Sequence, residues 1–309
     1  MGISMRIALF SERRDGHAGL LIEAMARRGV EAVPVLLRDC GVDTGHEHGL
    51  AIPGFESRLP DAAFVRGIPA GTFEQVTLRL SVLHALVGLG VTVWNSPRAI
   101  ECCIDKAMTS LLVAAAGLPT PRTFTAQSRA AAVAIAEREL RHGKLVLKPL
   151  FGAQGKGLKL IESAGDLPEE ADIAALYYMQ RFVEPAGGIW RDMRLFVCAG
   201  EVVAGMTRIG RGWITNIHQG GDAQPLLVTD DLRDLALAAA RVTGADYAGV
   251  DLIRGADGVT QILEVNSMPA WSGLQTVAGD CDIAEIIAGR FIAACARVQP
   301  MKSAAAQRP

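Results

Sequence analysis

The stretch GVDLIRGADGVTQILEVN, residues 249–266, holds two short apolar runs on either side of a polar turn. Asp257 and Gly258 lie between the runs 249–253 and 261–265. An Asp-Gly pair is a strong signal for a two-residue β-hairpin turn, because such turns need residues that tolerate positive φ. The stretch therefore predicts two antiparallel strands, and their valine, isoleucine and leucine content predicts that the pair is largely buried.

Three polar side chains interrupt these apolar runs. A turn centred between Asp257 and Gly258 places Asp251 opposite Glu264, about 5 Å away across the ladder. Asn266 is two residues beyond Glu264 and therefore points to the same face. Two carboxylates and a carboxamide suit magnesium, which takes oxygen ligands and shares them with bound phosphates. The alternative is a solvated polar face of the sheet.

A second informative stretch is KPLFGAQGKGLKL, residues 148–160, which has three glycines in six positions. It lacks the GxxxxGK[ST] spacing of a P-loop, and apolar residues typical of a strand follow it. A strand, a glycine-rich loop and a returning strand form a flap that can close over nucleotide phosphates. Its alternative is a plain mobile hairpin.

The bulk composition excludes several classes of protein. The 309 residues are 50% hydrophobic and 21% charged, with a net charge of −2. Such a balance gives no basic surface for nucleic acid or for an anionic membrane, so we expect neither partner. No segment is apolar enough to predict a membrane span, and the first residues do not resemble a signal peptide. We therefore expect a cytoplasmic protein.

The chain is long enough for two or three domains. Alternating strand and helix patterns in residues 1–96 predict an N-terminal α/β domain with a largely parallel sheet. Arg13 and Arg14 follow its first strand, where open α/β sheets bind ligands, and could meet an anionic substrate or lie in a solvated loop. Hairpin-like strands later in the chain predict separate α+β lobes over residues 97–183 and 184–297. We expect residues 298–309 to be a disordered tail.

Six segments identify a family resemblance. LVLKPLFGAQGKGLKL, YMQRFVE, RDMRLFV, TNIHQGG, YAGVDLI and EVNSMP occur in the order found in ATP-grasp enzymes. The chain resembles the RimK-like α-L-glutamate ligases in particular, over roughly residues 95–296. The resemblance implies an ATP-grasp fold, in which an N-terminal α/β domain precedes two α+β lobes that clamp ATP.

The resemblance also implies roles for individual residues. Arg194 and Arg208 correspond to arginines near the transferred phosphate and the tetrahedral intermediate, and Asn216 corresponds to a residue of a segment near the phosphates and the substrate. Asp251, Glu264 and Asn266 correspond to the metal ligands, in agreement with the hairpin geometry. The residues that correspond to the nucleotide site are Lys106, Lys148, Gly152, Gly155, Gly157, Gln180, Arg181, Phe182, Val183 and Glu184.

The activity implied by the resemblance is an ATP-dependent ligation of a carboxylate to an amine through an acylphosphate. The expected cofactors are ATP and two Mg²⁺ ions, with Mn²⁺ as the expected substitute. The expected substrates are L-glutamate and a carboxylate on a small molecule, cofactor or peptide, and the expected assembly is a homo-oligomer, a dimer or tetramer. Alternatives are a ligase for another amino acid or a dipeptide, a small-molecule kinase, and an inactive nucleotide-binding module.

Overall fold

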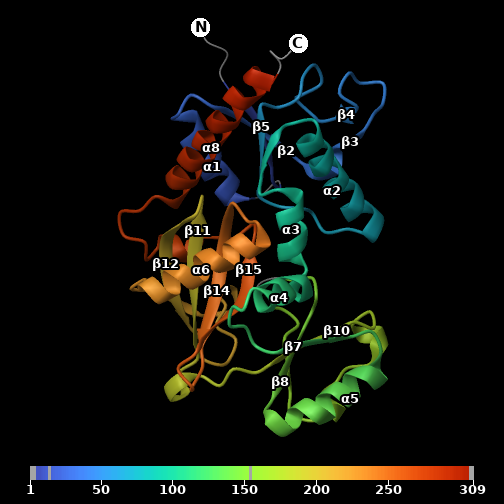
Figure 1. The fold of residues 1–309 in the computed structure, drawn as a ribbon, viewed down its shortest axis with the longest axis vertical. Coiled ribbons are helices and arrows are strands. Elements are labelled where there is room, and N and C mark those ends of the chain that lie inside the picture. Colours follow the sequence, from blue (N-terminus) through green and yellow to red (C-terminus); the bar gives the residue numbers. More distant parts are fainter. Residues whose placement is uncertain (1–4, 13–14, 153–154, 306–309) are drawn as a thin grey trace.

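The computed structural model describes residues 5–12, 15–152 and 155–305, which form three main sheets (Figure 1). The candidate residues Arg13 and Arg14 lie outside these ranges. The first sheet is at the top of Figure 1, the second at the bottom and the third between them, beside the helices α3 and α4. A fourth sheet is a two-stranded ribbon of β3 (Gly41–Val42) and β4 (Leu50–Ala51).

The N-terminal sheet is parallel, as predicted, with the strand order β2-β1-β5-β6. The Asp15 side chain accepts a hydrogen bond from the amide of His17 and so caps the helix α1. A capping box of Thr72 and Gln75 starts α2. The elements are β1 (Arg6–Phe10), α1 (Gly16–Ala26), β2 (Glu31–Val35), β5 (Ala62–Val65), α2 (Phe73–Gly88) and β6 (Thr92–Trp94).

The second sheet is antiparallel, with the order β7-β10-β8-β9, and one helix packs on it. Leu145, Leu147, Tyr177 and Met179 point into the same small core, because alternate residues of a strand share a face. The elements are β7 (Thr123–Ala126), α5 (Arg129–Glu139), β8 (Leu145–Lys148), β9 (Lys159–Ile161) and β10 (Tyr177–Arg181).

The third sheet is also antiparallel, with the order β13-β12-β11-β14-β15. One face packs against α6, and this contact buries Leu195, Val197, Ala236 and Val250. The elements are β11 (Arg191–Cys198), β12 (Glu201–Ile209), β13 (Asp222–Pro225), α6 (Asp230–Thr243), β14 (Tyr247–Arg254) and β15 (Thr260–Asn266).

The predicted hairpin of β14 and β15 is present, but its turn differs. The loop is three residues long, because the amide of Gly255 donates to the carbonyl of Val259, and Gly258 takes a φ of +82°. Compared with the predicted two-residue turn, this three-residue turn alone would shift the pairing of the two strands by one residue. A bulge at Leu263 restores the register, and Asp251 does face Glu264.

Helices α3 (Pro97–Ile104) and α4 (Lys106–Ala115) precede the second sheet in sequence but pack against the third (Figure 1). Ser96 caps α3 and Pro97 is its first residue, a position where proline loses no hydrogen bond. The boundary expected at residue 97 coincides with the first residue of α3.

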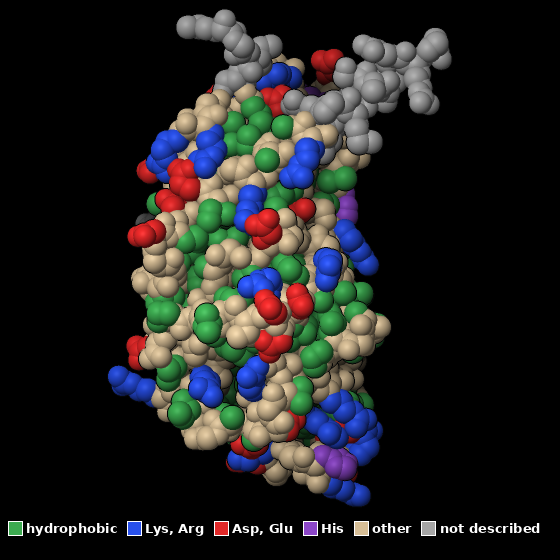
Figure 2. All heavy atoms as spheres, turned by 60° about the vertical axis from the view of Figure 1, so that its left-hand side comes forward, with side chains coloured by type: hydrophobic (Ala, Val, Ile, Leu, Met, Phe, Trp, Pro, Cys, Tyr) green, Lys and Arg blue, Asp and Glu red, His purple; other side chains and the backbone are tan. Residues whose placement is uncertain are grey.

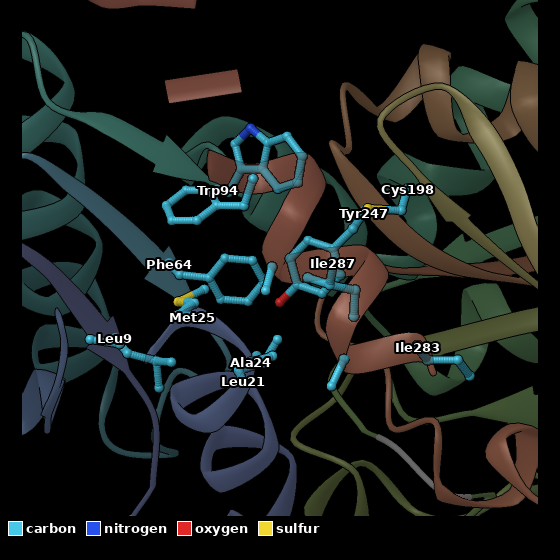
Figure 3. Close-up of a cluster of buried hydrophobic side chains, with 14 of the residues drawn as sticks. Leu9, Leu21, Ala24, Met25, Phe64, Trp94, Cys198, Tyr247, Ile283 and Ile287 are labelled. Carbon is cyan, nitrogen blue, oxygen red and sulfur yellow. The ribbon is translucent and has the colours of Figure 1, made fainter. Parts of the chain in front are cut away.

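The last helix, α8 (Ile283–Ala305), returns to the N-terminal domain and packs along α1. Figure 3 shows Ile283 and Ile287 of this helix among side chains of the N-terminal sheet and Tyr247 of the third sheet. One core thus joins the two regions, with the short α7 (Ser272–Gln275) beside it. The helix extends to Ala305, into the range 298–309 for which we predict a disordered tail, and residues 306–309 lie outside the described residues.

The surface agrees with the balanced composition. On the face shown in Figure 2, acidic and basic side chains are interspersed. Among the described residues, no helix is both long and apolar enough to cross a membrane. All six cysteines are free thiols, five of them buried.

Candidate active site

A cleft lies between the second and third sheets, and most of the predicted site residues line it. The third sheet contributes acidic and basic side chains. The second sheet contributes residues 180–183 at the end of β10, which we call the hinge, and the base of the glycine-rich flap. The predicted residues that line the cleft are Lys106, Lys148, Gly152, Gly155, Gln180, Arg181, Phe182, Val183, Arg208, Asn216, Asp251 and Glu264. Gly157, Glu184, Arg194 and Asn266 are adjacent to it rather than on its walls.

The two carboxylates predicted to bind metal share one face of the third sheet. Asp251 and Glu264 are directly paired across β14 and β15, and Asn266 is paired with Gly249. The hydrogen-bond geometry orients the Asn266 amide so that Nδ2 donates to Glu264 Oε1 at 3.2 Å. Asp251 is 4% exposed, whereas the Glu264 side chain is 28% exposed. Glu264 is therefore the more accessible of the two carboxylates.

Two arginines hold the Asp251 carboxylate. Arg194 Nε and Nη2 donate to its two oxygens at 2.6 and 2.7 Å, and Arg208 Nη2 lies 3.0 Å from Oδ2. Burial raises the pKa of Asp251, but the two guanidinium charges outweigh it and bring that pKa below its ordinary value. Asp251 is therefore an anion over the whole physiological range of pH.

Asp192 is a member of the site that the motif analysis did not assign. It faces Arg208 directly across β11 and β12 and accepts two hydrogen bonds of 2.6 Å from its Nε and Nη2. Both side chains are buried and line the cleft. The sequence carried a signal, since Asp192 and Arg194 alternate in RDMR and so share a face.

Lys148 ends β8 and enters the cleft from the second sheet. Its Nζ donates to Gln180 Oε1 at 2.5 Å, and Gln180 Nε2 donates to Thr123 Oγ1 at 3.1 Å. Burial lowers the pKa of Lys148 to about 8, because the charged ammonium loses hydration there. A polyanion bound in the cleft would favour the charged ammonium form of Lys148.

Lys106 is the first residue of α4 and joins the two walls of the cleft. Its Nζ donates to the carbonyl of Gly152 at 2.7 Å and lies 3.5 Å from Glu264 Oε1. Asp105 fixes the start of the helix by accepting hydrogen bonds from the amides of Ala107 and Met108. The helix cap thus places the lysine between the flap and a predicted metal ligand.

The flap glycines approach other groups closely. Gly155 has a φ of +70°, and a Cβ there would lie 2.5 Å from Asn216 Oδ1. Gly157 also has a positive φ of +72°, and a Cβ there would lie 2.8 Å from Pro149 Cγ. Both positions therefore require glycine, and Gly155 brings the flap against the predicted catalytic residue Asn216.

The hinge is built from the end of β10. The amides of Arg181 and Phe182 donate to the carbonyls of Arg122 and Lys144, each at 2.9 Å. Glu139 on α5, 1% exposed, accepts hydrogen bonds from Arg181 Nε and Nη2 at 3.1 and 2.7 Å. Two of the backbone amides in the hinge are therefore already bonded within the protein.

Two tryptophans flank the hinge residue Phe182. The Phe182 ring is 5.9 Å from Trp190 and 6.0 Å from Trp213, centroid to centroid, in edge-to-face arrangements. Glu184 lies just beyond and lines an adjoining depression, and its carbonyl accepts from the amide of Ala256. Phe182 and Trp213 also line the cleft.

The donors of the cleft suit a hard cation. Asp251 and Glu264 present carboxylate oxygens on one sheet face, and the Asn266 amide oxygen accepts from Arg194 Nη2 at 3.3 Å. Oxygen is the ligand type that Mg²⁺ prefers. Within the described ranges, no cluster of three or more histidine, cysteine or acidic side chains could hold a metal by itself. A cation held here would therefore complete its shell with the amide, with water or with phosphate oxygens.

The three-sheet arrangement and the charged cleft are those of an ATP-grasp enzyme. The family model described as "RimK-like ATP-grasp domain" matches residues 103–290. The chain therefore belongs to the RimK-like ATP-grasp family, and it is an ATP-dependent ligase of the amino-acid-ligating class. The predicted fold, family and enzyme class are confirmed.

Two relatives are named tetrahydromethanopterin:alpha-L-glutamate ligase. The one from Methanococcus maripaludis is 32% identical over 292 residues, which cover 91% of this chain and 96% of that protein. The one from Methanocaldococcus jannaschii is 31% identical over 300 residues, covering 93% and 98%.

Solved structures share the fold at lower identity. The ATP-grasp ligase PsnB, complexed with a phosphomimetic variant of its minimal precursor, Mg and ADP, superposes with a TM-score of 0.74 at 21% identity, covering 94% of this chain and 99% of that one. A RimK domain protein from Sphaerobacter thermophilus superposes with a TM-score of 0.67 at 22% identity, covering 93% and 99%.

Proposed function

We propose that this ATP-dependent ligase joins the amino group of L-glutamate to a carboxylate through an acylphosphate. The observation that carries the proposal is the facing pair Asp251 and Glu264, with Lys106 and Lys148 beside it. Acidic metal ligands next to lysines suit a nucleotide triphosphate, whose charge needs both kinds of partner. The names of the two methanogen relatives support glutamate as the added amino acid.

In this proposal the second sheet binds the nucleotide. Lys148 and Lys106 contact the phosphates, and the hinge residues up to Val183 hold the adenine by their backbone, with Glu184 near the ribose. Asp251, Glu264 and Asn266 hold Mg²⁺, two ions or Mn²⁺ in their place. When bound, the metal supplies positive charge that offsets repulsion between the phosphate and the carboxylate. The solved PsnB complex with Mg and ADP supports nucleotide and metal binding in this fold.

The remaining residues act on the reacting groups. A carboxylate is a poor electrophile, and its phosphorylated form accepts an amine readily. Arg194 and Arg208 provide fixed guanidinium charge for the transferred phosphate and for the oxyanion that forms on amine attack. Asn216 lies where the flap closes, and Gly155 allows the flap to approach it. The closed flap excludes water, which would hydrolyse the acylphosphate.

The acceptor is a carboxylate on a small molecule, a cofactor or a peptide. The relatives named for tetrahydromethanopterin support a small-molecule cofactor, while PsnB is complexed with a peptide precursor. Another amino acid or a dipeptide in place of glutamate is the second candidate. We also propose a homo-oligomer, a dimer or a tetramer.

Isotopically labelled L-glutamate tests the proposal. The protein, Mg–ATP and labelled glutamate are incubated with a metabolite extract, and mass spectrometry searches for labelled amides. We expect products heavier by one or more labelled glutamyl residues, formed only with ATP. ATP-dependent amides that lack the label would favour another amino acid, and phosphorylated products without new amides would favour a kinase. Nucleotide binding without any product would favour an inactive module.

A further inference from the structure

We infer that Asp192 is a positioning residue that holds Arg208 in place and thereby leaves Asp251 free to bind the metal. The inference rests on the proposed function, since it assumes that Asp251 is a metal ligand.

The sheet presents these charges in a fixed order. Arg208 on β12 faces Asp192 on β11, and Arg194 on β11 faces Asp251 on β14. Residues 192 and 194 share a face, so the four side chains lie in two adjacent rows. Glu264 on β15 continues the second row.

The two arginines are held differently. Arg208 gives two hydrogen bonds of 2.6 Å to Asp192 and makes only one approach, of 3.0 Å, to Asp251. Among the residues that the structure describes, Arg194 forms an ion pair with Asp251 alone, through two hydrogen bonds. Arg208 thus has a carboxylate of its own, whereas Arg194 depends on the predicted metal ligand.

This difference matters because an arginine cannot discharge by losing its proton. A buried guanidinium without a carboxylate partner is unfavourable, so such an arginine stays paired with any anion that lies close to it. With Asp192 in place, the positive charge of Arg208 remains neutralised when Asp251 binds a cation. Without Asp192, Arg208 would compete with the metal for Asp251.

Metal binding measures the effect without catalysis. Mn²⁺ is titrated into protein saturated with ADP, and free Mn²⁺ is followed by electron paramagnetic resonance. We expect Asp192→Asn to raise the Kd for Mn²⁺ about 10- to 100-fold, the usual effect of losing a partner that orients a metal ligand. ADP affinity without metal should change much less. Glu201→Gln is the control, because it breaks an exposed ion pair with Arg290 at the start of β12.

A double-mutant cycle separates positioning from simple loss of negative charge. We expect Asp192→Asn to change the Kd little in an Arg208→Met background, because no guanidinium is left to compete. An equal increase in Kd in both backgrounds would overturn the inference, as would an unchanged Kd in D192N.

Two further outcomes are distinguishable. If D192N fails to fold, Asp192→Glu displaces the guanidinium while keeping the charge. We expect that variant to raise the Kd, and a wild-type Kd would overturn the inference. If wild-type protein with ADP binds no Mn²⁺, the proposed function itself fails.

Discussion

Lys148 Nζ donates a hydrogen bond of 2.5 Å to Gln180 Oε1, and burial holds the pKa of this lysine at about 8. Phosphate groups favour the charged ammonium and raise that pKa. Between pH 8 and the raised pKa, ATP binding therefore takes up protons, and ATP affinity falls as the pH rises. Calorimetry above pH 8, in buffers that differ in ionisation enthalpy, measures the uptake.

The control for this prediction is Lys148→Met. The variant should bind ATP more weakly, and the proton uptake above pH 8 should disappear. Uptake of the same size in the variant and the wild type would show that another group titrates.

Substitutions of the two predicted metal ligands Glu264 and Asp251 should differ in their effect on the free energy of unfolding. Glu264→Gln should lower kcat/KM more than about 100-fold, while the free energy of unfolding changes by less than about 1 kcal/mol, since Glu264 is partly exposed. Asp251→Asn should lower kcat/KM by a similar factor. It should also lower the free energy of unfolding by about 3 kcal/mol, because it leaves Arg194 without its carboxylate. Chemical denaturation and steady-state kinetics measure both quantities. Wild-type activity in either variant would contradict the metal assignment.

Gly155→Ala should impair the approach of the flap to Asn216. Its φ is +70°, and the new methyl group would meet Asn216 Oδ1 at 2.5 Å. We expect kcat/KM for ATP to fall about 10- to 100-fold, as small misplacements near reacting groups do. Gly165→Ala is the matched control, because Gly165 lies outside the cleft, lacks a positive φ and its Cβ would lie 3.6 Å from Ser163 Oγ. Equal kinetics in the two variants would refute this role for Gly155.

Asn95 ties the N-terminal domain to the third sheet. The fully buried amide donates to the carbonyls of Tyr247 and Ser267 and accepts from the amides of Asp246 and Tyr247. Asn95→Ala leaves these groups unsatisfied and should lower the free energy of unfolding by about 3 kcal/mol or more. Urea denaturation measures the loss. A change below about 1 kcal/mol would mean that neighbouring groups replace the bonds.

The hairpin shows how far the sequence can predict the site. Alternating apolar residues around Asp257 and Gly258 predicted both strands and the pairing of Asp251 with Glu264. The three-residue turn and the bulge at Leu263 were not predicted, and their register shifts cancel. A bulge depends on packing between strands, which a local pattern does not record.

Other features depend on contacts between distant segments. The apolar stripe of α8 predicts a buried face but does not identify α1 as its partner. The pairing of Asp192 with Arg208 likewise requires the register of β11 and β12, which have no sequence signal as clear as Asp-Gly. By contrast, Ser96 and Pro97 are a helix-start signal that was available in the sequence.

The central claim is that this protein activates a carboxylate by phosphorylation before an amine attacks it. An acceptor identified with labelled glutamate is prepared with ¹⁸O in its carboxylate and turned over with Mg–ATP and L-glutamate. Mass spectrometry of the released phosphate then detects the label. We expect one ¹⁸O atom in each phosphate, because one oxygen of the acceptor's carboxylate leaves with the phosphate. Phosphate without ¹⁸O, formed together with the amide, would contradict the acylphosphate route.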